Sequence, residues 1–442
     1  MEYFVNIASV YLSAQDRTLP SLMAVYQNPA LLEPKIKEVL NNGLEEKNIR
    51  GKKVLLKPNW VKHSSNEADE WCMRTHDHFL LAALKVVLDF GPAEVLIGDA
   101  PIQGCYWDKM LSPEFLEQIS RLSSQSGIPV PIKDFRRVTF DPSRNNPVKE
   151  RNPLSDYLIF DMGKQSHLEP ITRSDKKQFR VTNYDPDRLS ESHQPGVHKY
   201  CITKALFDAD VVISLPKVKT HQKAGITAAL KNIVGLNGDK DYLPHHRLGG
   251  TGYGGDCYPG KNRLRYWSEL AMDNANRRQG TWKFRPWQKL SSLLWRISFP
   301  GMEHHISAAW YGNDTTWRMV LDLNKIVIYG KADGTLAKVP QRQLFSLCDG
   351  IIGGQGDGPL KPDPLPLGIV SFTNNSGMND LAMASLMGFD VNKIPMLKTV
   401  LLASNQQATQ LLWNGKPTDL NKLKAFSVKT TPPPGWVKYF KT

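Results

Sequence analysis

The sequence predicts an α/β protein, a mostly parallel open sheet with helices on both faces that is elaborated by long insertions. Three observations lead to this prediction. Short apolar runs at residues 53–56, 93–97 and 211–214 are typical of buried strands. Helical segments alternate with these runs, which indicates parallel strands joined by crossover helices. Polar residues follow each run, at the end of the strand where open α/β sheets bind ligands.

The composition indicates a globular protein with an anionic partner. At 442 residues and 41% hydrophobic, the chain is long enough to bury a large core. The net charge of +13 favours an anionic partner, but the basic residues are spread along the chain and form no recognisable nucleic-acid-binding module. Nucleic acid is therefore disfavoured. Five cysteines without any CxxC pair disfavour a disulfide framework and an iron–sulfur cluster.

The sequence has no segment typical of a leader or a membrane span. No apolar run approaches roughly 20 residues, and the first residues lack the pattern of a signal peptide, so we expect a cytoplasmic protein. We divide the chain into a strand and helix segment at 1–50, an α/β domain at 51–400 with insertions at about 140–200 and 240–310, and a C-terminal helix with a Pro-rich tail at 401–442.

Polar side chains end the first strands of the predicted sheet. An edge strand at residues 3–10 and a helix at 30–44 come first. The next strand ends in Lys57 and Asn59, and the strand after it ends in Asp99. We therefore expect a basic loop and a carboxylate at neighbouring strand ends.

Two histidines stand at the start of the helix between these strands. The spacing of His76 and His78 would suit a metal on a strand, but here a helix begins. We favour a helix N-cap at Thr75 or Asp77, because polar side chains at that position bond to free backbone N–H groups.

A basic stretch follows the strand at 211–214. We expect a loop and then a helix opened by Gly225. A helix N-terminus attracts anions, and the nearby cations would add donors. The stretch is therefore either an anion-binding cradle or a solvated loop before an ordinary surface helix. Its polar residues are Lys217, Lys219, His221, Thr227, Lys231 and Gly235.

A glycine-rich loop at residues 249–256 comes directly after His245, His246 and Arg247. The backbone of such a loop either comes close to another group or is mobile. In a loop, adjacent histidines can converge on one ligand or metal, and an unrelated structural role is the alternative.

Residues 282–297 combine tryptophans, leucines and cations in helical phase. Helical spacing places Trp287, Leu290, Leu294 and Ile297 on one face. A basic, Trp-rich helix of this kind can lie in a membrane interface. A core-packing helix with an exposed basic edge is the alternative and is more common.

The last third of the chain continues the α/β pattern. We expect a strand at 326–328, a strand that runs into a glycine loop with Asp357, and a strand at 368–372 before a helix that carries Asp380. The glycine loop is not a dinucleotide fingerprint, because Pro359 intervenes and no helix follows.

Parallel neighbouring strands would bring these polar loops to one rim and form a pocket. Its lysines would bind an anion, and its carboxylates would hold a divalent cation such as Mg, Mn or Zn, or act as acids and bases. Each polar residue capping its own loop is the alternative. The metal candidates are Asp99, Asp357 and Asp380.

Eight short segments together form a recognisable pattern: residues 56–59, 75–76, 97–99, 215–221, 231–235, 356–359, 379–380 and 387–389. In this order they resemble one protein family, the domain-of-unknown-function family 362. The resemblance implies a fold-sized unit and little chemistry. Many proteins of the family carry a ferredoxin-like cysteine cluster, which this longer chain lacks. Some resemble members that are found alongside polysaccharide-assembly functions.

We expect an enzyme that acts on a phosphorylated or carboxylated metabolite, such as a glycan or lipid-linked precursor. His221 is the acid–base candidate, with Lys219 and Asp99 as catalytic partners. Phosphoryl transfer or hydrolysis is slightly favoured over isomerisation. The ligand-binding candidates are Lys57, Asn59, Thr75, His76, Lys217, Thr227, Lys231, Asn232, His245, His246 and Arg247.

The alternative is a non-catalytic protein that binds an anionic ligand and docks on a partner or on the inner face of a membrane through residues 282–297. Substituting His221 distinguishes the two, because an enzyme would keep binding and lose turnover.

Overall fold

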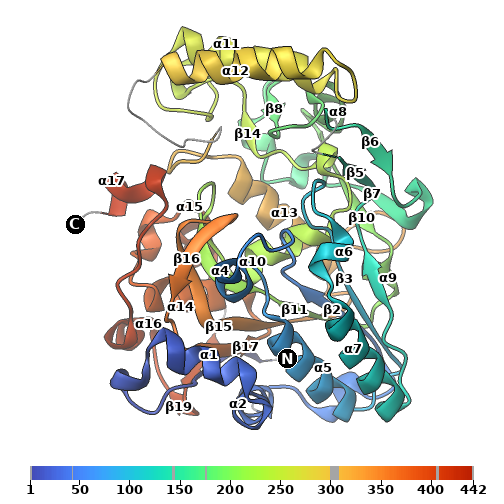
Figure 1. The fold of residues 1–442 in the computed structure, drawn as a ribbon, viewed down its shortest axis with the longest axis vertical. Coiled ribbons are helices and arrows are strands. Elements are labelled where there is room, and N and C mark those ends of the chain that lie inside the picture. Colours follow the sequence, from blue (N-terminus) through green and yellow to red (C-terminus); the bar gives the residue numbers. More distant parts are fainter. Residues whose placement is uncertain are drawn as a thin grey trace.

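A mixed β-sheet runs through the centre of the molecule (Figure 1). The computed structural model describes residues 2–41, 43–141, 145–174, 177–298, 308–404 and 408–440. Its main strands are β1 (Tyr3–Ser9), β2 (Lys53–Pro58), β3 (Glu94–Asp99), β4 (Ile132–Asp134), β11 (Val211–Leu215), β15 (Gln343–Asp357), β17 (Ile369–Thr373), β18 (Thr409–Trp413) and β19 (Lys416–Pro417). Within the described residues the order is β19-β18-β1-β17-β15-β11-β2-β3-β4.

The strands that carry the predicted polar ends are parallel neighbours. β15, β11, β2, β3 and β4 pair in parallel, which confirms the predicted mostly parallel sheet. Pro58 pairs with Leu215, and Leu56 pairs with Ile97. The carboxyl ends of β2, β3 and β11 therefore lie at one edge of the sheet.

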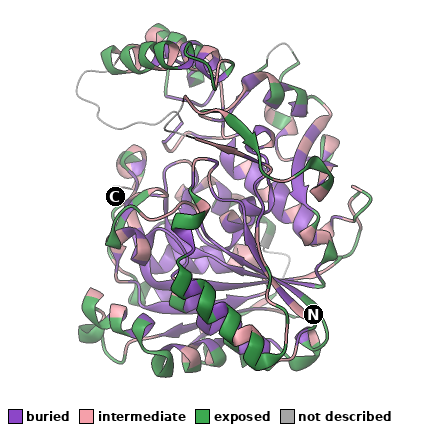
Figure 2. Ribbon diagram, turned by 45° about the vertical axis from the view of Figure 1, so that its right-hand side comes forward, coloured by how far each residue is buried: buried purple, intermediate pink, exposed green. Residues whose placement is uncertain are grey.

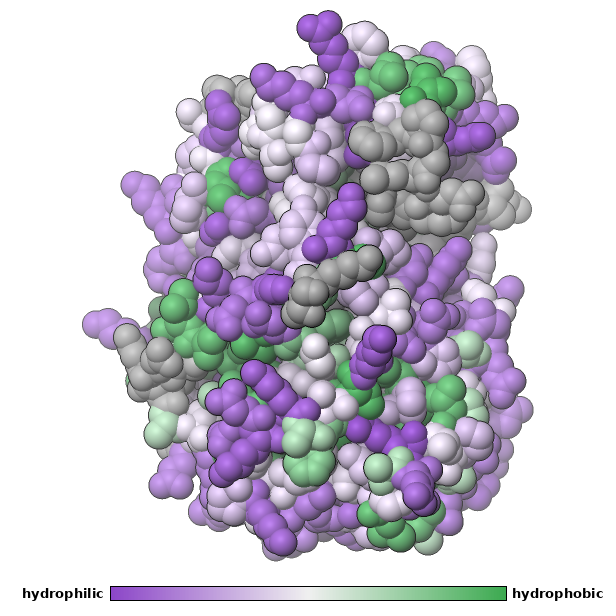
Figure 3. All heavy atoms as spheres, turned by 90° about the vertical axis from the view of Figure 1, so that its left-hand side faces the viewer, coloured by the Kyte–Doolittle hydropathy of each residue, from purple (hydrophilic) through white to green (hydrophobic). Residues whose placement is uncertain are grey.

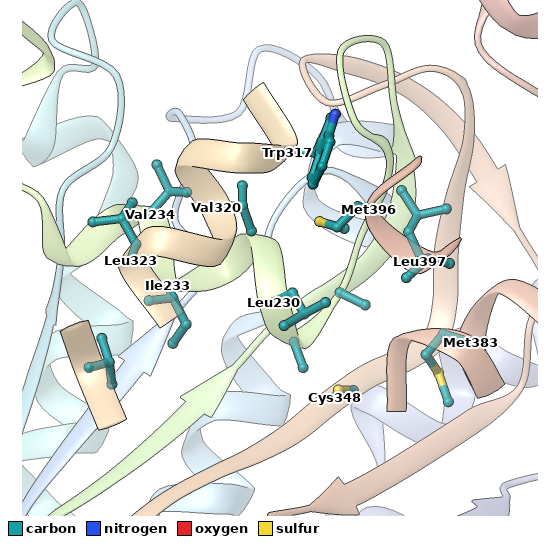
Figure 4. Packing of buried hydrophobic residues seen from close by; sticks show 14 of the residues in the cluster. Leu230, Ile233, Val234, Trp317, Val320, Leu323, Cys348, Met383, Met396 and Leu397 are labelled. Carbon is teal, nitrogen blue, oxygen red and sulfur yellow. The ribbon is translucent and has the colours of Figure 1, made fainter. Parts of the chain in front are cut away.

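Helices cover both faces of the sheet, as predicted. Side chains on a strand alternate between the faces, so Val212 packs into one core and Ile213 into the other (Figure 2 shows the buried interior). Trp317, Val320 and Leu323 lie in the first of these cores (Figure 4). One face carries α1 (Leu19–Gln27), α2 (Pro29–Asn41), α5 (Asp77–Asp89) and α7 (Pro113–Ser126), and the other carries α10 (Ala229–Asn232), α13 (Thr316–Tyr329), α14 (Ser376–Leu386) and α15 (Pro395–Ser404).

The two predicted insertions form an upper layer above the sheet (Figure 1). The insertion at about 140–200 contains several short strands. Residues 142–144, 175–176 and 299–307 of the insertions lie outside the described residues. The upper layer contains β5 (Val138–Phe140), β6 (Val148–Glu150), β7 (Tyr157–Asp161), β8 (Phe179–Arg180), α8 (Pro186–Ser192), β9 (His193–Gln194), β10 (Val197–Thr203), β14 (His246–Arg247), α11 (Arg263–Asn276) and α12 (Phe284–Ile297).

The basic stretch after β11 differs from the prediction. In place of a loop and a helix opened by Gly225, it forms a hairpin of β12 (Lys217–His221) and β13 (Gly225–Thr227), and β12 also pairs with β15. The φ of Gly225 is +85°, a conformation that glycine adopts easily and that suits the hairpin turn. Only four residues, Ala229–Asn232, form the α-helix, so Thr227 is not on a helical face with Lys231.

Three other predicted elements differ from the structure. Residues 326–328 are the last turn of α13 rather than a strand, because burial of Ile326 and Val327 outweighs their β propensity. β1 is not an edge strand, since β17 and β18 flank it. Residues 401–442 contain β18 and β19, as well as the end of α15 and short helices. In the described part of the chain, no helix combines the length and apolar composition needed to cross a membrane.

Candidate functional site

A cavity of about 530 Å³ lies where the polar strand ends meet. The ends of β2 and β3, the β12–β13 hairpin and the turn of α10 all contribute to it. Its size is that of a small-molecule site. Nine of the predicted site residues line this cavity: Lys57, Asn59, Asp99, Lys219, His221, Thr227, Lys231, Asn232 and His245.

Lys57 and Asp99 form a buried ion pair beside the cavity. Lys57 Nζ lies 2.8 Å from Asp99 Oδ1 and also donates to the carbonyl of Pro58 at 2.8 Å and to Asn232 Oδ1 at 3.2 Å. The second carboxylate oxygen, Oδ2, accepts from the backbone N–H of Trp60 at 2.7 Å. Both side chains are therefore occupied by the protein itself, and neither is a free ligand group.

Three polar groups in the cavity wall have no partner within the described residues. Asn59 Nδ2, Thr182 Oγ1 and Thr227 Oγ1 are buried and make no hydrogen bond there. Asn232 differs, because its amide donates to Ser214 Oγ at 2.8 Å and to the carbonyl of Lys57 at 3.2 Å. Asn59, Thr182 and Thr227 thus offer one amide and two hydroxyls that a ligand could use, while Asn232 positions Lys57.

The charge around the cavity is strongly unbalanced. Six lysines and one aspartate line it, and the aspartate is paired with Lys57. Lys219 Nζ donates to the backbone carbonyls of Met73 and, at 3.0 Å, Pro359. Four of the other lysines form no ion pair with a carboxylate within the described part of the chain; Lys219 and Lys240 are buried, whereas Lys223 and Lys231 are half-buried.

Burial lowers the pKa of these lysines, and neighbouring lysines add to the effect for Lys219, Lys231 and Lys240. Burial first, and then Lys217, lower the pKa of Lys219 to about 7. Burial, with Lys240 and Lys57 next, lowers the pKa of Lys231 to about 7. An anion in the cavity would reverse this effect by stabilising the ammonium form.

Two neutral histidines face the cavity with opposite hydrogen-bonding character. His221 Nδ1 accepts from the backbone N–H groups of Lys223 at 3.1 Å and Ala224 at 3.2 Å, so its proton lies on Nε2. His245 Nδ1 lies 2.7 Å from the carbonyl oxygen of Leu243 and must donate to it, so its Nε2 is unprotonated. Burial, with nearby lysines next, keeps the pKa of both rings well below 6.5. His221 therefore does not titrate near neutral pH, in contrast to the sequence-based expectation.

Lys217 is placed away from the cavity although it shares a strand with Lys219. Its ammonium group lies 2.7 Å from Asp349 Oδ2 and donates to Tyr26 Oη at 3.0 Å, and the exposed fraction of both charged side chains is 0%. Lys217 thus stabilises the packing of β12 on β15 and is not among the residues that line the cavity.

Thr75 and His76 also lie outside the cavity lining. Thr75 Oγ1 donates to the carbonyl of Leu215 at 2.5 Å and accepts from the N–H of Asn59 at 2.8 Å. The N-cap of α5 is His76, not Thr75 or Asp77, and its Nδ1 accepts from the N–H of His78 at 3.2 Å. These residues therefore link β2, β11 and α5 and support the cavity from behind.

The three predicted metal-binding carboxylates do not come together. Asp380 accepts from the first N–H groups of α10, Ala229 at 2.8 Å and Leu230 at 3.1 Å, so the helix end expected to hold an anion is occupied. Asp357 accepts from the amide of Gln222. With Asp99 paired to Lys57, each carboxylate has a separate partner.

A different set of side chains is arranged as metal ligands. Potential ligand atoms of His246, Cys257 and Glu269 all lie within 4.8 Å of one another, the one such group of three among the described residues. Although His246 follows His245 directly, it lies outside the cavity lining. Arg247 is also outside it and lies 3.6 Å from Asp256 and 3.8 Å from Asp314.

Sequence reasoning missed three lysines of the cavity, Lys62, Lys223 and Lys240. Lys223 stands in the same basic stretch as Lys219 and His221, and recognising the hairpin turn would have placed it beside them. Lys240 follows α10 between Asp239 and Asp241, a setting that is typical of solvated surface charge. No sequence pattern indicated the partners of His246, because Cys257 lies in a loop and Glu269 in a separate helix.

The family model for the domain of unknown function DUF362 matches residues 161–385, half of the chain. The chain belongs to the DUF362 family. This confirms the resemblance found in the sequence. The DUF362 match includes the hairpin, α10 and Asp357, whereas Lys57 and Asp99 precede it.

Relatives of known name add little about the chemistry of this DUF362 chain. A thylakoid-associated protein of Synechocystis sp. is 23% identical over 235 residues, which cover 53% of this chain and 48% of that relative. The match thus spans about half the length of that protein.

Two solved structures are distantly similar to this chain. A protein from Thermotoga maritima has 8% identity and a TM-score of 0.32, covering 86% of this chain and 59% of that one. The lactate racemase apoprotein from Thermoanaerobacterium thermosaccharolyticum has 12% identity and a TM-score of 0.32, and the match covers 82% of this chain and 55% of that one. At these TM-scores neither likeness carries an argument about this chain.

Proposed function

We propose that the chain is an enzyme that acts on a small phosphorylated or carboxylated molecule bound in the cavity. The observation that supports this proposal is the unbalanced charge: six lysines line the cavity, and its one aspartate is paired with Lys57. Buried charges without a partner are costly, and a phosphate or carboxylate would pair with several of them at once. Asn59 Nδ2 and Thr227 Oγ1 would donate further hydrogen bonds.

The side chains around the bound molecule favour proton transfer. His221 offers an N–H donor and His245 an unprotonated nitrogen. Lys219 and Lys231, whose pKa values are about 7, exchange protons near neutral pH. We therefore place isomerisation or hydrolysis ahead of phosphoryl transfer, because Asp99, Asp357 and Asp380 are held by partners within the protein.

The first experiment measures binding of inorganic phosphate to the full chain by calorimetry. We expect saturable binding that Lys231→Met weakens by about tenfold or more, since one charge-assisted hydrogen bond is worth about 1.5–3 kcal/mol. Lys398→Met, at an exposed position on α15 outside the cavity lining, is the control and should bind as wild type does. No binding by wild type, or equal loss in both variants, would refute the anion site.

The second experiment separates an enzyme from a binding protein. Mixtures of phosphorylated and carboxylated metabolites are incubated with wild type and with His245→Gln, and products are followed by NMR. An enzyme converts one of the compounds, and the variant keeps phosphate affinity and loses conversion. Binding without any conversion supports the non-catalytic alternative.

A second candidate function, binding at a membrane surface, is favoured by the α11–α12 pair. In α12 only Phe284 and Ser291 are buried. Leu290, Leu293 and Ile297 are 40%, 54% and 52% exposed. Hydrophobic side chains gather beside hydrophilic ones at the top of the molecule, where these helices lie (Figure 3). Between residues 274 and 302 the sequence has six Lys or Arg and no Asp or Glu, which complements an anionic lipid surface.

Vesicle sedimentation tests this second function. We expect the chain to sediment with phosphatidylglycerol-containing vesicles, less in high salt, and not with phosphatidylcholine alone. Leu293→Ser should reduce sedimentation, whereas Leu402→Ser, at a position 68% exposed on α15, should not. Equal sedimentation of both variants, or no sedimentation of wild type, would show that this surface does not bind lipid.

A further inference from the structure

We propose that His246, Cys257 and Glu269 bind a divalent metal ion of the zinc class. The set lies outside the cavity lining, and the cavity lysine Lys223 is its nearest link to the cavity, because its charge acts on Cys257 and His246. Imidazole nitrogen, thiolate sulfur and carboxylate oxygen are the protein ligands of zinc, and a thiolate in the set disfavours magnesium and calcium.

The three side chains come from three separate elements and converge in a buried place. His246 lies on β14, Cys257 follows the glycine-rich loop, and Glu269 lies on α11. Their exposed fractions are 3%, 2% and 6%. His246 Nε2 lies 3.5 Å from Glu269 Oε1, and potential ligand atoms of all three residues lie within 4.8 Å of one another. Ligands of a tetrahedral zinc ion lie roughly 3.3–3.8 Å apart, so a small contraction would suffice.

The polar groups of this set are not satisfied by the surrounding protein. Glu269 Oε2 accepts from the backbone N–H of Gly249 at 2.9 Å, which fixes the carboxyl group, and the thiol of Cys257 donates to that group; Oε1 accepts no other hydrogen bond within the described residues. The nearby guanidinium of Arg180 is already paired with Asp273 at 3.0 Å. His246 Nδ1 also lacks a hydrogen-bond partner in that part of the chain. A metal ion would take the place of the thiol proton between Cys257 and Glu269 and would hold the imidazole in place.

A bound ion would also explain how the outer helices are attached. Three protein ligands leave at least one coordination position for water. The metal would link α11, and through it α12, to β14 and to the loop that carries His245. Loss of the ion should therefore loosen the upper layer and leave the central sheet intact.

The test uses the full chain without a histidine tag, stripped with a chelator and titrated with Co²⁺ as a spectroscopic probe for zinc. We expect one equivalent to bind, with visible d–d bands and a thiolate-to-cobalt charge-transfer band, and Zn²⁺ to displace it. Cys257→Ser should lose the charge-transfer band. Cys201→Ser is the matched control, because Cys201 is equally buried but lies on β10 away from the set.

Two outcomes would overturn the proposal: no saturable Co²⁺ binding by wild type, or the same charge-transfer band in Cys257→Ser. Circular dichroism checks that each variant is folded. If Cys257→Ser does not fold, Glu269→Gln takes its place and should weaken Co²⁺ binding by at least about tenfold while keeping the charge-transfer band. Unchanged affinity in that variant would also refute the site.

Discussion

The ammonium group of Lys57 lies 2.8 Å from Asp99 Oδ1, and the exposed fractions of the two side chains are 1% and 4%. The two residues expected to bind an anion and a cation therefore satisfy each other. Because this pair is neutral, the positive charge of the cavity comes from the lysines around it. The pair also fixes the ends of β2 and β3 with respect to each other, which holds the cavity in shape.

Gly235→Ala should break this pair. A Cβ atom at residue 235 would lie 1.8 Å from Asp99 Oδ1 and 2.7 Å from Lys57 Nζ, so the pair would have to move. We expect a loss of about 1–3 kcal/mol in the free energy of unfolding, as for other overpacked sites, together with weaker sulfate binding. Urea denaturation and calorimetry measure the two effects.

Gly334→Ala is the control for this prediction. Residue 334 has a φ of +84° and open space around its Cβ position, so the substitution strains the backbone without touching the cavity. We expect lower stability and unchanged sulfate affinity. If both variants keep wild-type sulfate affinity, the Lys57–Asp99 pair does not shape the anion site.

Anion binding should weaken as the pH rises above 7. Burial and neighbouring cations lower the pKa of Lys219 and Lys231 to about 7, so each ammonium group loses its proton as the pH passes that value. Only the charged form pairs with an anion. For each lysine that contacts the anion, we expect affinity to fall by up to about tenfold per pH unit above its pKa.

Sulfate is the suitable probe for this profile because its charge is constant in this range. Calorimetry from about pH 6 to about pH 9 gives the dissociation constants. A flat profile would show that lysines with normal pKa values, or groups other than lysine, bind the anion.

Much of the fold could be predicted from the sequence, because apolar runs and helical periodicity depend on local residues. The strands at 53–56, 93–97 and 211–214 and the helix between the first two occur as expected. The predictions failed where pairing with a strand far away in the sequence determines the structure. β12 pairs with β15, more than one hundred residues later in the chain, and β1 is flanked by the C-terminal β18. No local pattern contains this information.

The sequence allowed us to predict that the loops converge at one site. It did not allow us to predict which lysine forms an ion pair with which carboxylate. Parallel strands bring their ends together, so Lys57, Asp99 and Lys219 could be grouped from the sequence. Which lysine has a carboxylate partner depends on the packing of side chains. Lys217 and Lys219 have the same local context, yet only Lys217 meets an aspartate.

His245 and His246 should act separately although they are adjacent. His245 lines the cavity, and His246 lies beside Glu269. His246→Gln should leave sulfate affinity unchanged and reduce Co²⁺ binding, whereas His245→Gln should leave Co²⁺ binding unchanged. Calorimetry with each probe on both variants checks this. Loss of both kinds of binding in one variant would indicate a single shared site.

Lys217 and Lys219 provide the sharpest contrast between a structural and a ligand-binding lysine. Lys217→Met would leave the buried Asp349 carboxylate without its cation, which typically costs about 3–5 kcal/mol of the free energy of unfolding. Lys219→Met would remove a buried cation that has no carboxylate partner within the described residues, so stability should stay the same or rise. Sulfate affinity should change in the opposite order: about tenfold weaker in Lys219→Met and unchanged in Lys217→Met. Urea denaturation and calorimetry on the two variants check both halves. If Lys217→Met stays stable and loses sulfate binding, the anion is bound on the Asp349 side of β12, and the assignment of the cavity is wrong.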